Sequence, residues 1–115
     1  MKKITDLNIK LFADGANKSE MLEMSKKSFI KGLTTNPTLM KKAGIKNYEY
    51  FAKDILNEII DKPISFEVFS DNIDEMEQQA YKISKWGNNV YVKIPISNTK
   101  GEPTYSLIKK LSSNG

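Results

Sequence analysis

The sequence contains no cysteine, no histidine and no arginine, and each absence excludes a class of chemistry. Without cysteine the chain has no disulfide, no thiolate nucleophile, no iron–sulfur cluster and no ordinary zinc knuckle. Without histidine it has no imidazole base and no His-ligated metal, and we expect neither a metal site nor a cofactor. Acid–base chemistry must therefore come from lysine, aspartate, glutamate or tyrosine.

All 18 basic residues are lysines, and the formal net charge is +4 at pH 7. Proteins that read nucleic acids usually rely on arginine for bidentate contacts to guanine or phosphate. The lysine pairs of this chain lie in helix-like segments, where such pairs are typical of solvated faces. We therefore expect no nucleic-acid partner, although a modest positive field can attract a small anionic substrate.

No apolar stretch approaches the ~18 residues that would span a bilayer. Met1 is followed by two lysines and then by Ile4-Thr5-Asp6 rather than by a hydrophobic signal core. The sequence thus predicts a cytoplasmic protein without membrane contact. Its 115 residues, 39% hydrophobic and 28% charged, fit a single domain, residues 1–115.

Strand-like and helix-like segments alternate along the chain. Strands are predicted over residues 8–14, 29–35, 64–70 and 90–96, and helices over 18–28, from Pro37, from Asn47 to Pro63, around Ile73 to Ile83, and around Leu107 to Leu111. Four strand-then-helix units imply parallel strands with right-handed crossovers in an α/β fold. A closed eight-stranded α/β barrel takes ~250 residues, with ~200 as a lower limit, so the chain has about half of one.

Each predicted strand carries a polar residue near its carboxyl end, on the face opposite its aliphatic side chains. Lys93 stands in the middle of the most hydrophobic strand, 90–96, and faces away from its valines and isoleucines. By the same period of two, Asp14, Asn36 and Glu67 lie on the polar face of the other strands. The carboxyl ends of parallel strands form the ligand site in barrels and open α/β sheets, so we expect these four side chains to converge there.

A structural interpretation competes with this one. Lys93 can be an edge-strand lysine that prevents aggregation, with Glu67 as its ion-pair partner. Four strands that obey the same rule weaken this explanation, because independent protective residues have no reason to share a face. For Asn36-Pro37 the alternative is an ordinary strand-to-helix turn, which is compatible with a ligand role.

A lysine among carboxylates, without a histidine, a metal site or a glycine-rich phosphate loop, suggests amine catalysis on a carbonyl. Lys93 must lose its proton before it can attack. Burial between apolar neighbours favours the neutral amine, whereas Asp14 and Glu67 favour the ammonium ion, and the sequence does not decide between them.

Four segments resemble, in order and spacing, the first four strands of the transaldolase family, particularly its short bacterial and archaeal members and the related fructose-6-phosphate aldolases. The segments are Leu11-Phe12-Ala13-Asp14, Gly32-Leu33-Thr34-Thr35-Asn36-Pro37-Thr38, Ser65-Phe66-Glu67-Val68 and Val92-Lys93-Ile94-Pro95. The resemblance covers essentially the whole chain but about half of a family barrel. It implies the first four strands of a TIM-type (β/α)8 barrel, that is, a half-barrel.

The resemblance also implies catalytic roles. Lys93 falls on the Schiff-base lysine, which condenses with the C2 carbonyl of a ketose phosphate so that the C3–C4 bond can break and leave a dihydroxyacetone unit as an enamine. Asp14 falls on the acid–base residue that acts on the C4 hydroxyl. Glu67 matches the carboxylate that works through a bound water in imine formation and hydrolysis.

For substrate binding, the resemblance implies that Asn36 holds the hydroxyls of the dihydroxyacetone unit, with Thr34 and Thr35 shaping the site around it. Glu67 favours a transaldolase, because the fructose-6-phosphate aldolases place glutamine at this position. The implied reaction is then transfer to erythrose 4-phosphate in the pentose phosphate pathway rather than release of free dihydroxyacetone. Sugar phosphates are the implied substrates, and a homo-oligomer is the implied state of the complete protein.

The chain departs from the family in two ways. The family binds the substrate phosphate through an arginine and supports the site from strands five to eight, and none of these is present. The loop over residues 97–103 is longer than in the compact members, which alters the approach to Lys93. An alternative of another class therefore stays open: a non-catalytic half-barrel that pairs its sheet edges with itself or with another chain.

Overall fold

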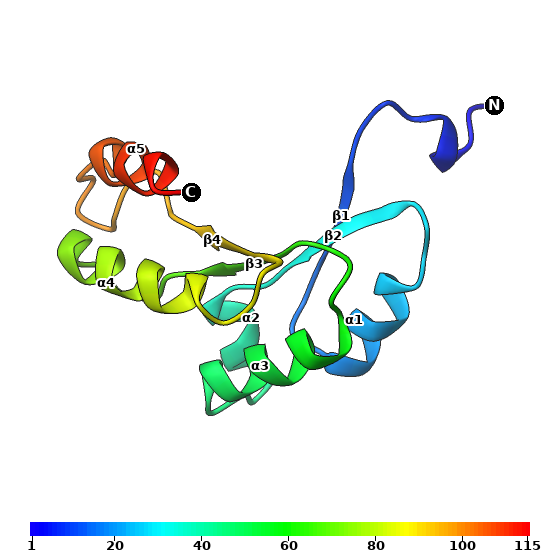
Figure 1. Ribbon diagram of the computed structural model, residues 1–115, viewed down its shortest axis with the longest axis horizontal. Helices are drawn as coiled ribbons and strands as arrows, with labels where there is room; N and C mark the ends of the chain where they lie inside the picture. Colours follow the sequence, from blue (N-terminus) through cyan, green and yellow to red (C-terminus); the bar gives the residue numbers. More distant parts are fainter.

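The computed structural model describes residues 1–115, in which four parallel strands alternate with helices in one sheet of order β1-β2-β3-β4 (Figure 1). The strands are β1 (Leu11–Asp14), β2 (Ile30–Thr34), β3 (Ile64–Glu67) and β4 (Val90–Lys93). The helices are the 3-10 helix η1 (Ile4–Asp6) and the α-helices α1 (Lys18–Ser25), α2 (Pro37–Lys42), α3 (Tyr48–Glu58), α4 (Ile73–Ser84) and α5 (Tyr105–Ser113). Every neighbouring pair of strands is parallel, so the predicted α/β fold is confirmed.

Asparagine side chains begin four of the five α-helices. The N-caps of α1, α2, α3 and α4 are Asn17, Asn36, Asn47 and Asn72, and each side-chain oxygen accepts a backbone N–H three residues further on, at 2.9 or 3.0 Å. Such a cap stabilises a helix by about 1 kcal/mol. Pro37, the first residue of α2, adds a fixed φ that suits a helix start. Local sequence therefore determines where these helices begin.

All four strands and the helices α1 and α3 are shorter than the sequence predicts. β1 begins at Leu11 rather than at residue 8, because its pairing with β2 begins only there. β4 ends at Lys93 rather than at residue 96, because Pro95 has no N–H to donate to a neighbouring strand. The first helix ends at Ser25 rather than at residue 28, and η1 is absent from the predicted elements.

β3 also ends early, and the alternation of faces ends with it. The sequence predicts this strand to residue 70, and alternation up to that end would place Phe69 on the same face as Glu67. The strand ends at Glu67, and the ring of Phe69 lies 5.8 Å from the ring of Tyr48 on α3. Phe69 therefore belongs to the helix side of the molecule, and its predicted face is wrong.

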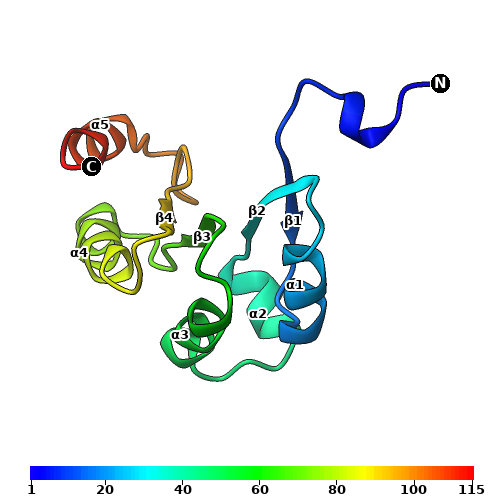
Figure 2. The same ribbon diagram turned by 45° about the vertical axis from the view of Figure 1, so that its right-hand side comes forward.

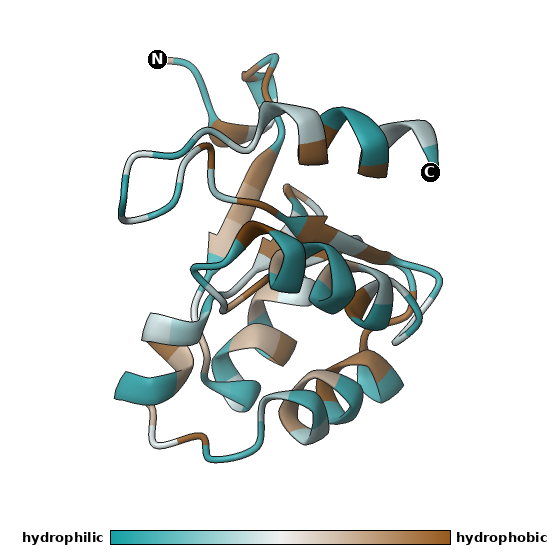
Figure 3. Ribbon diagram, turned by 90° about the vertical axis from the view of Figure 1, so that its left-hand side faces the viewer, coloured by the Kyte–Doolittle hydropathy of each residue, from teal (hydrophilic) through white to brown (hydrophobic).

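The helix-facing side of the sheet holds the hydrophobic core. Helices α1 to α4 lie along this side of the strands, and α5 packs against α4 beyond β4 (Figure 2). Leu33, Ile64 and Phe66 are strand residues of this core, each with 0% exposure. In Figure 3 the strand segments are largely brown, whereas the helices alternate brown and teal turns, as expected for amphipathic helices on a sheet. No helix offers the long apolar stretch that crossing a membrane requires.

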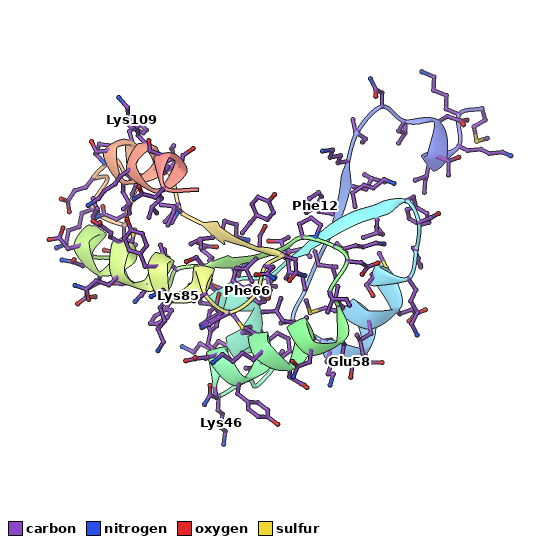
Figure 4. The ribbon with its side chains drawn as sticks, viewed as in Figure 1. Phe12, Lys46, Glu58, Phe66, Lys85 and Lys109 are labelled. Atoms are coloured by element: carbon purple, nitrogen blue, oxygen red, sulfur yellow. The ribbon has the colours of Figure 1, made fainter.

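The opposite side of the sheet has no covering layer. Phe12 and Tyr91 are 45% and 64% exposed, and Figure 4 shows Phe12 on the other side of the sheet from the buried Phe66. Neither β1 nor β4 has a strand neighbour on its outer side. An uncovered face and two unpaired edges are what half of a closed barrel presents.

Phe12 and Gly32 pack closely on this uncovered face. A register shift in the pairing of β1 with β2 places the two residues opposite each other. A Cβ atom at Gly32 would lie 2.4 Å from the Phe12 ring, so a larger residue would displace the ring. The glycine at this position is therefore explained by close packing.

Candidate active site

Four predicted site residues lie at one end of the sheet. Asp14, Glu67 and Lys93 are the last residues of β1, β3 and β4, and Asn36 caps α2 directly after β2. Glu67 and Lys93 are direct partners in the pairing of β3 with β4. The structure thus places these side chains at the carboxyl ends of the strands, where parallel α/β sheets bind ligands.

The Lys93 amine lies between a hydroxyl and a carboxylate. Its Nζ donates a hydrogen bond of 2.7 Å to Thr34 Oγ1 and lies 3.8 Å from Glu67 Oε2. To reach Thr34 on β2, the lysine side chain crosses β3. The side chains of Lys93 and Glu67 are 36% and 28% exposed. The amine therefore has two partners, and the lysine side chain that carries it stays partly exposed.

Thr34 is the closer of these two partners and the one at hydrogen-bonding distance. The 3.8 Å separation of Lys93 from Glu67 is that of an ion pair without a direct hydrogen bond. A hydroxyl that accepts from an ammonium group keeps its own hydrogen for another acceptor. Thr34 can therefore orient the lysine and donate to a substrate oxygen at the same time.

Asn36 serves a structural purpose that leaves half of its carboxamide free. Its Oδ1 accepts the backbone N–H of Leu39 at 2.9 Å as the cap of α2. Its Nδ2 makes no hydrogen bond within the chain, so both N–H groups remain able to donate. The turn and ligand interpretations of Asn36 are therefore compatible in the structure.

A cavity of about 590 Å³ opens at this end of the sheet. Asp14, Asn36 and Glu67 line it from the strand ends, and Ser97 and Thr99 line it from the loop after β4. Pockets of about 300–1,000 Å³ are the usual size for small-molecule sites. Lys93 does not itself line this cavity, but its amine lies 3.8 Å from the carboxylate of Glu67, which does, so the amine stands beside the cavity.

The loop after β4 is fastened to the segment between β3 and α4. Asp71 accepts the hydroxyl of Thr99 at 2.6 Å and its backbone N–H at 2.8 Å, and these hydrogen bonds lower the pKa of the Asp71 carboxyl. Within the loop, Asn98 Oδ1 accepts the backbone N–H groups of Lys100 and Glu102 at 3.1 and 2.9 Å. Residues 97–99 of this hydrogen-bonded loop therefore form one wall of the cavity.

A family model described as "Transaldolase/Fructose-6-phosphate aldolase" matches residues 11–115, beginning at the first residue of β1. The chain belongs to the transaldolase/fructose-6-phosphate aldolase family. The resemblance seen in the strand segments is thereby confirmed. The predicted fold is confirmed with it, since the four strand–helix units are the first units of the TIM-type barrel of this family.

Several curated relatives in this family carry the description "Probable transaldolase". The one from Thermoplasma volcanium is 44% identical over 106 residues, which are 90% of this chain and 45% of that protein. Those from Sulfurihydrogenibium sp. and Dehalococcoides mccartyi are 40% and 36% identical over 89 and 107 residues, covering 77% and 93% of this chain and 40% and 48% of the relatives. The chain spans about half the length of the curated relatives it matches.

Thr35, which the family resemblance placed around the substrate, lies on the other side of the sheet from Thr34. It has 0% exposure, and its Oγ1 is buried without a hydrogen-bond partner. The alternation of side chains along β2 already separates Thr35 from its neighbours Thr34 and Asn36. Thr35 therefore neither lines the cavity nor contacts Lys93.

Two residues beside the candidate site are absent from the sequence predictions. Tyr48 Oη donates to the backbone carbonyl of Glu67 at 2.7 Å, and Gln79 Oε1 accepts the backbone N–H of Phe69 at 2.9 Å. Both residues lie on helices, where helical periodicity gives no reason to connect them with a strand end. The available signal was a hydroxyl-bearing side chain in the otherwise apolar stripe of α3.

Proposed function

We propose that this chain carries the Schiff-base chemistry of a transaldolase, in which the Lys93 amine attacks the C2 carbonyl of a ketose phosphate. The supporting observation is the Lys93 amine itself, 2.7 Å from Thr34 Oγ1 and 3.8 Å from Glu67 Oε2 at the carboxyl ends of four parallel strands. The proposed place of the reaction is the pentose phosphate pathway of the cytoplasm, and the complete enzyme is proposed to be a homo-oligomer.

In the proposed reaction, the neutral Lys93 amine adds to C2, and the resulting carbinolamine takes up a proton and loses water to give a protonated imine. When the C3–C4 bond breaks, the imine takes up its electron pair and a dihydroxyacetone enamine remains on Lys93. Asp14 accepts the C4 hydroxyl proton as the aldehyde leaves and returns a proton when an acceptor aldehyde adds. Glu67 relays protons through a water during imine formation and hydrolysis.

Substrate hydroxyls would be held by the groups that the structure leaves free. The Nδ2 of Asn36 and the hydroxyl hydrogen of Thr34 can both donate to the dihydroxyacetone unit. The chain has no arginine, so we expect the phosphate to be bound by barrel strands outside residues 1–115. In this proposal, these four strands carry out imine formation and carbon–carbon bond cleavage, and the rest of the barrel binds the phosphate.

Transfer and simple cleavage are distinguished by their products. With fructose 6-phosphate and erythrose 4-phosphate, we expect the full-length protein to form a seven-carbon ketose phosphate, and to release little free dihydroxyacetone when the acceptor is omitted. Free dihydroxyacetone as the main product would instead favour an aldolase, the other activity in the family description. Absence of both products would contradict the proposed function.

Glu67→Gln tests the choice between these two activities. We expect the variant to slow the proton transfers at the imine by about 100-fold, because an amide cannot act as a general acid or base. Its remaining activity should shift from transfer toward release of free dihydroxyacetone, and the ratio of the two products measures this shift. Glu58→Gln, at the exposed end of α3, is the control. An unchanged ratio and rate in Glu67→Gln would contradict the assigned role.

Asp14→Asn should slow carbon–carbon cleavage more than imine formation, because the proposed carboxylate acts on the C4 hydroxyl and not on the amine. The expected loss in the cleavage rate is about 100-fold. Rapid-quench measurements compare the imine trapped by borohydride with the aldehyde released. Asp61→Asn changes an exposed carboxylate between α3 and β3 and should leave both rates unchanged. Equal slowing of both steps in Asp14→Asn would contradict the prediction.

A further inference from the structure

The backbone carbonyl of Glu67 lacks the partner that a parallel ladder would normally provide. Two residues earlier on β3, the carbonyl of Ser65 accepts the N–H of Thr35 at 3.2 Å. Parallel ladders repeat every two residues on each strand, so the Glu67 carbonyl would face the N–H of residue 37. That residue is Pro37, which has no N–H and already belongs to α2.

Tyr48 replaces the missing donor. Its hydroxyl donates to the Glu67 carbonyl at 2.7 Å from the first residue of α3. Its ring centroid lies 6.4, 5.8 and 5.6 Å from those of Phe66, Phe69 and Trp86. Three aromatic neighbours therefore direct the hydroxyl at the end of β3.

The Tyr48 hydroxyl also stays protonated and able to donate. Burial raises the pKa of Tyr48, and the negative charge of Glu67 raises it further. The group therefore keeps its hydrogen throughout the neutral pH range.

The residues that follow Glu67 are hydrogen-bonded to α4 and to β4. Gln79 Oε1 on α4 accepts the backbone N–H groups of Phe69 and Ser70 at 2.9 and 3.1 Å. Val68, between these contacts, donates its N–H to the carbonyl of Lys93 at 3.2 Å. The end of β3 is thus fixed by α3, by α4 and by β4, although the strand has lost its partner on β2.

We propose that Tyr48 is a positioning residue, whose hydroxyl fixes the backbone of Glu67 so that the carboxylate stays beside the Lys93 amine. This inference rests on the proposed Schiff-base function of Lys93. Tyr48 touches neither Lys93 nor the cavity and acts only through Glu67. Its effect should therefore fall on proton transfer and not on substrate binding.

Tyr48→Phe removes the hydroxyl and keeps the ring. We expect kcat of the full-length enzyme to fall about 10-fold with an unchanged KM, less than the ~100-fold that a misplacement of 1 Å can cost. Tyr50→Phe is the matched control, because Tyr50 lies on the same helix, is 73% exposed and should show wild-type kinetics. Circular dichroism melting of both variants confirms that each is folded under the assay conditions.

A double-mutant cycle with Glu67→Gln separates positioning from a general structural effect. If Tyr48 acts through Glu67, then Tyr48→Phe causes no further loss of kcat once Glu67 is glutamine. A second 10-fold loss in that background, or a raised KM with an unchanged kcat in the single variant, would overturn the inference. Wild-type kinetics in Tyr48→Phe would overturn it while the proposed function stands, whereas an inactive wild-type enzyme would overturn the proposed function itself.

Discussion

Replacing Lys93 by methionine is expected to lower kcat of the full-length enzyme by about 10⁵-fold, the scale on which loss of a covalent nucleophile acts. Methionine keeps much of the length of lysine but has no amine, so no imine can form. Thr34 and Glu67 should stay in place because β2 and β3 are paired with each other independently of Lys93. The ion pair that is lost is partly exposed, so the melting temperature should change little.

Borohydride reduction tests whether Lys93 itself forms the imine. With fructose 6-phosphate present, reduction should add mass to the peptide that contains Lys93 in the wild type, and to no peptide in Lys93→Met. Lys31→Met is the matched control, since Lys31 also lies on a strand but is exposed and donates to the carbonyl of Ser28 at 3.0 Å. Labelling of another lysine with Lys93 untouched would contradict the assignment.

Residues 1–115 in isolation are expected to show no measurable transaldolase turnover. Phe12 and Tyr91 are 45% and 64% exposed on the uncovered face, and the outer edges of β1 and β4 have no strand partner. Water therefore has free access to the amine, and no other strand provides a phosphate site. These surfaces should make the isolated chain associate or remain a loosely packed monomer.

A coupled assay on purified residues 1–115, run beside size-exclusion chromatography, measures both outcomes. Adding the remaining strands of the barrel as a separate polypeptide is the positive control and should restore activity. A defined, inactive oligomer would favour the alternative of a non-catalytic assembly subunit. Turnover of ~1 to 10³ per second, as in ordinary enzymes, would show that four strands are sufficient and would contradict the prediction.

The strand positions of Asp14, Glu67 and Lys93 could be predicted because side-chain alternation is a property of any extended backbone. The contact between Lys93 and Thr34 could not be predicted in the same way. It spans β3, so it depends on the relative stagger of three strands, which is set by residues far apart in the sequence. Alternation therefore identifies the face of a residue but not its partner.

The residues that the sequence predictions misplaced or missed also have physical explanations. Phe69 was assigned a face as if β3 continued, but the strand ends where Pro37 removes the next hydrogen-bond donor from β2. Helical periodicity accounts for Tyr48 as one more residue of the apolar stripe, so the sequence gives no sign that its hydroxyl bonds to a strand end. Thr35 shares a motif with Thr34 and Asn36, and a motif does not show which of its members faces away from the ligand.

The asparagine caps of α1 to α4 are hydrogen bonds that acid leaves intact. An aspartate in the same position loses its negative charge as the pH falls, whereas a carboxamide has no proton to gain in this range. Ion pairs such as Lys18–Asp54, at 2.9 Å on the surface, weaken both in acid and in concentrated salt. The four cap hydrogen bonds persist under both conditions, so acidification below about pH 4, where carboxylates become protonated, should weaken the surface ion pairs and leave these caps in place.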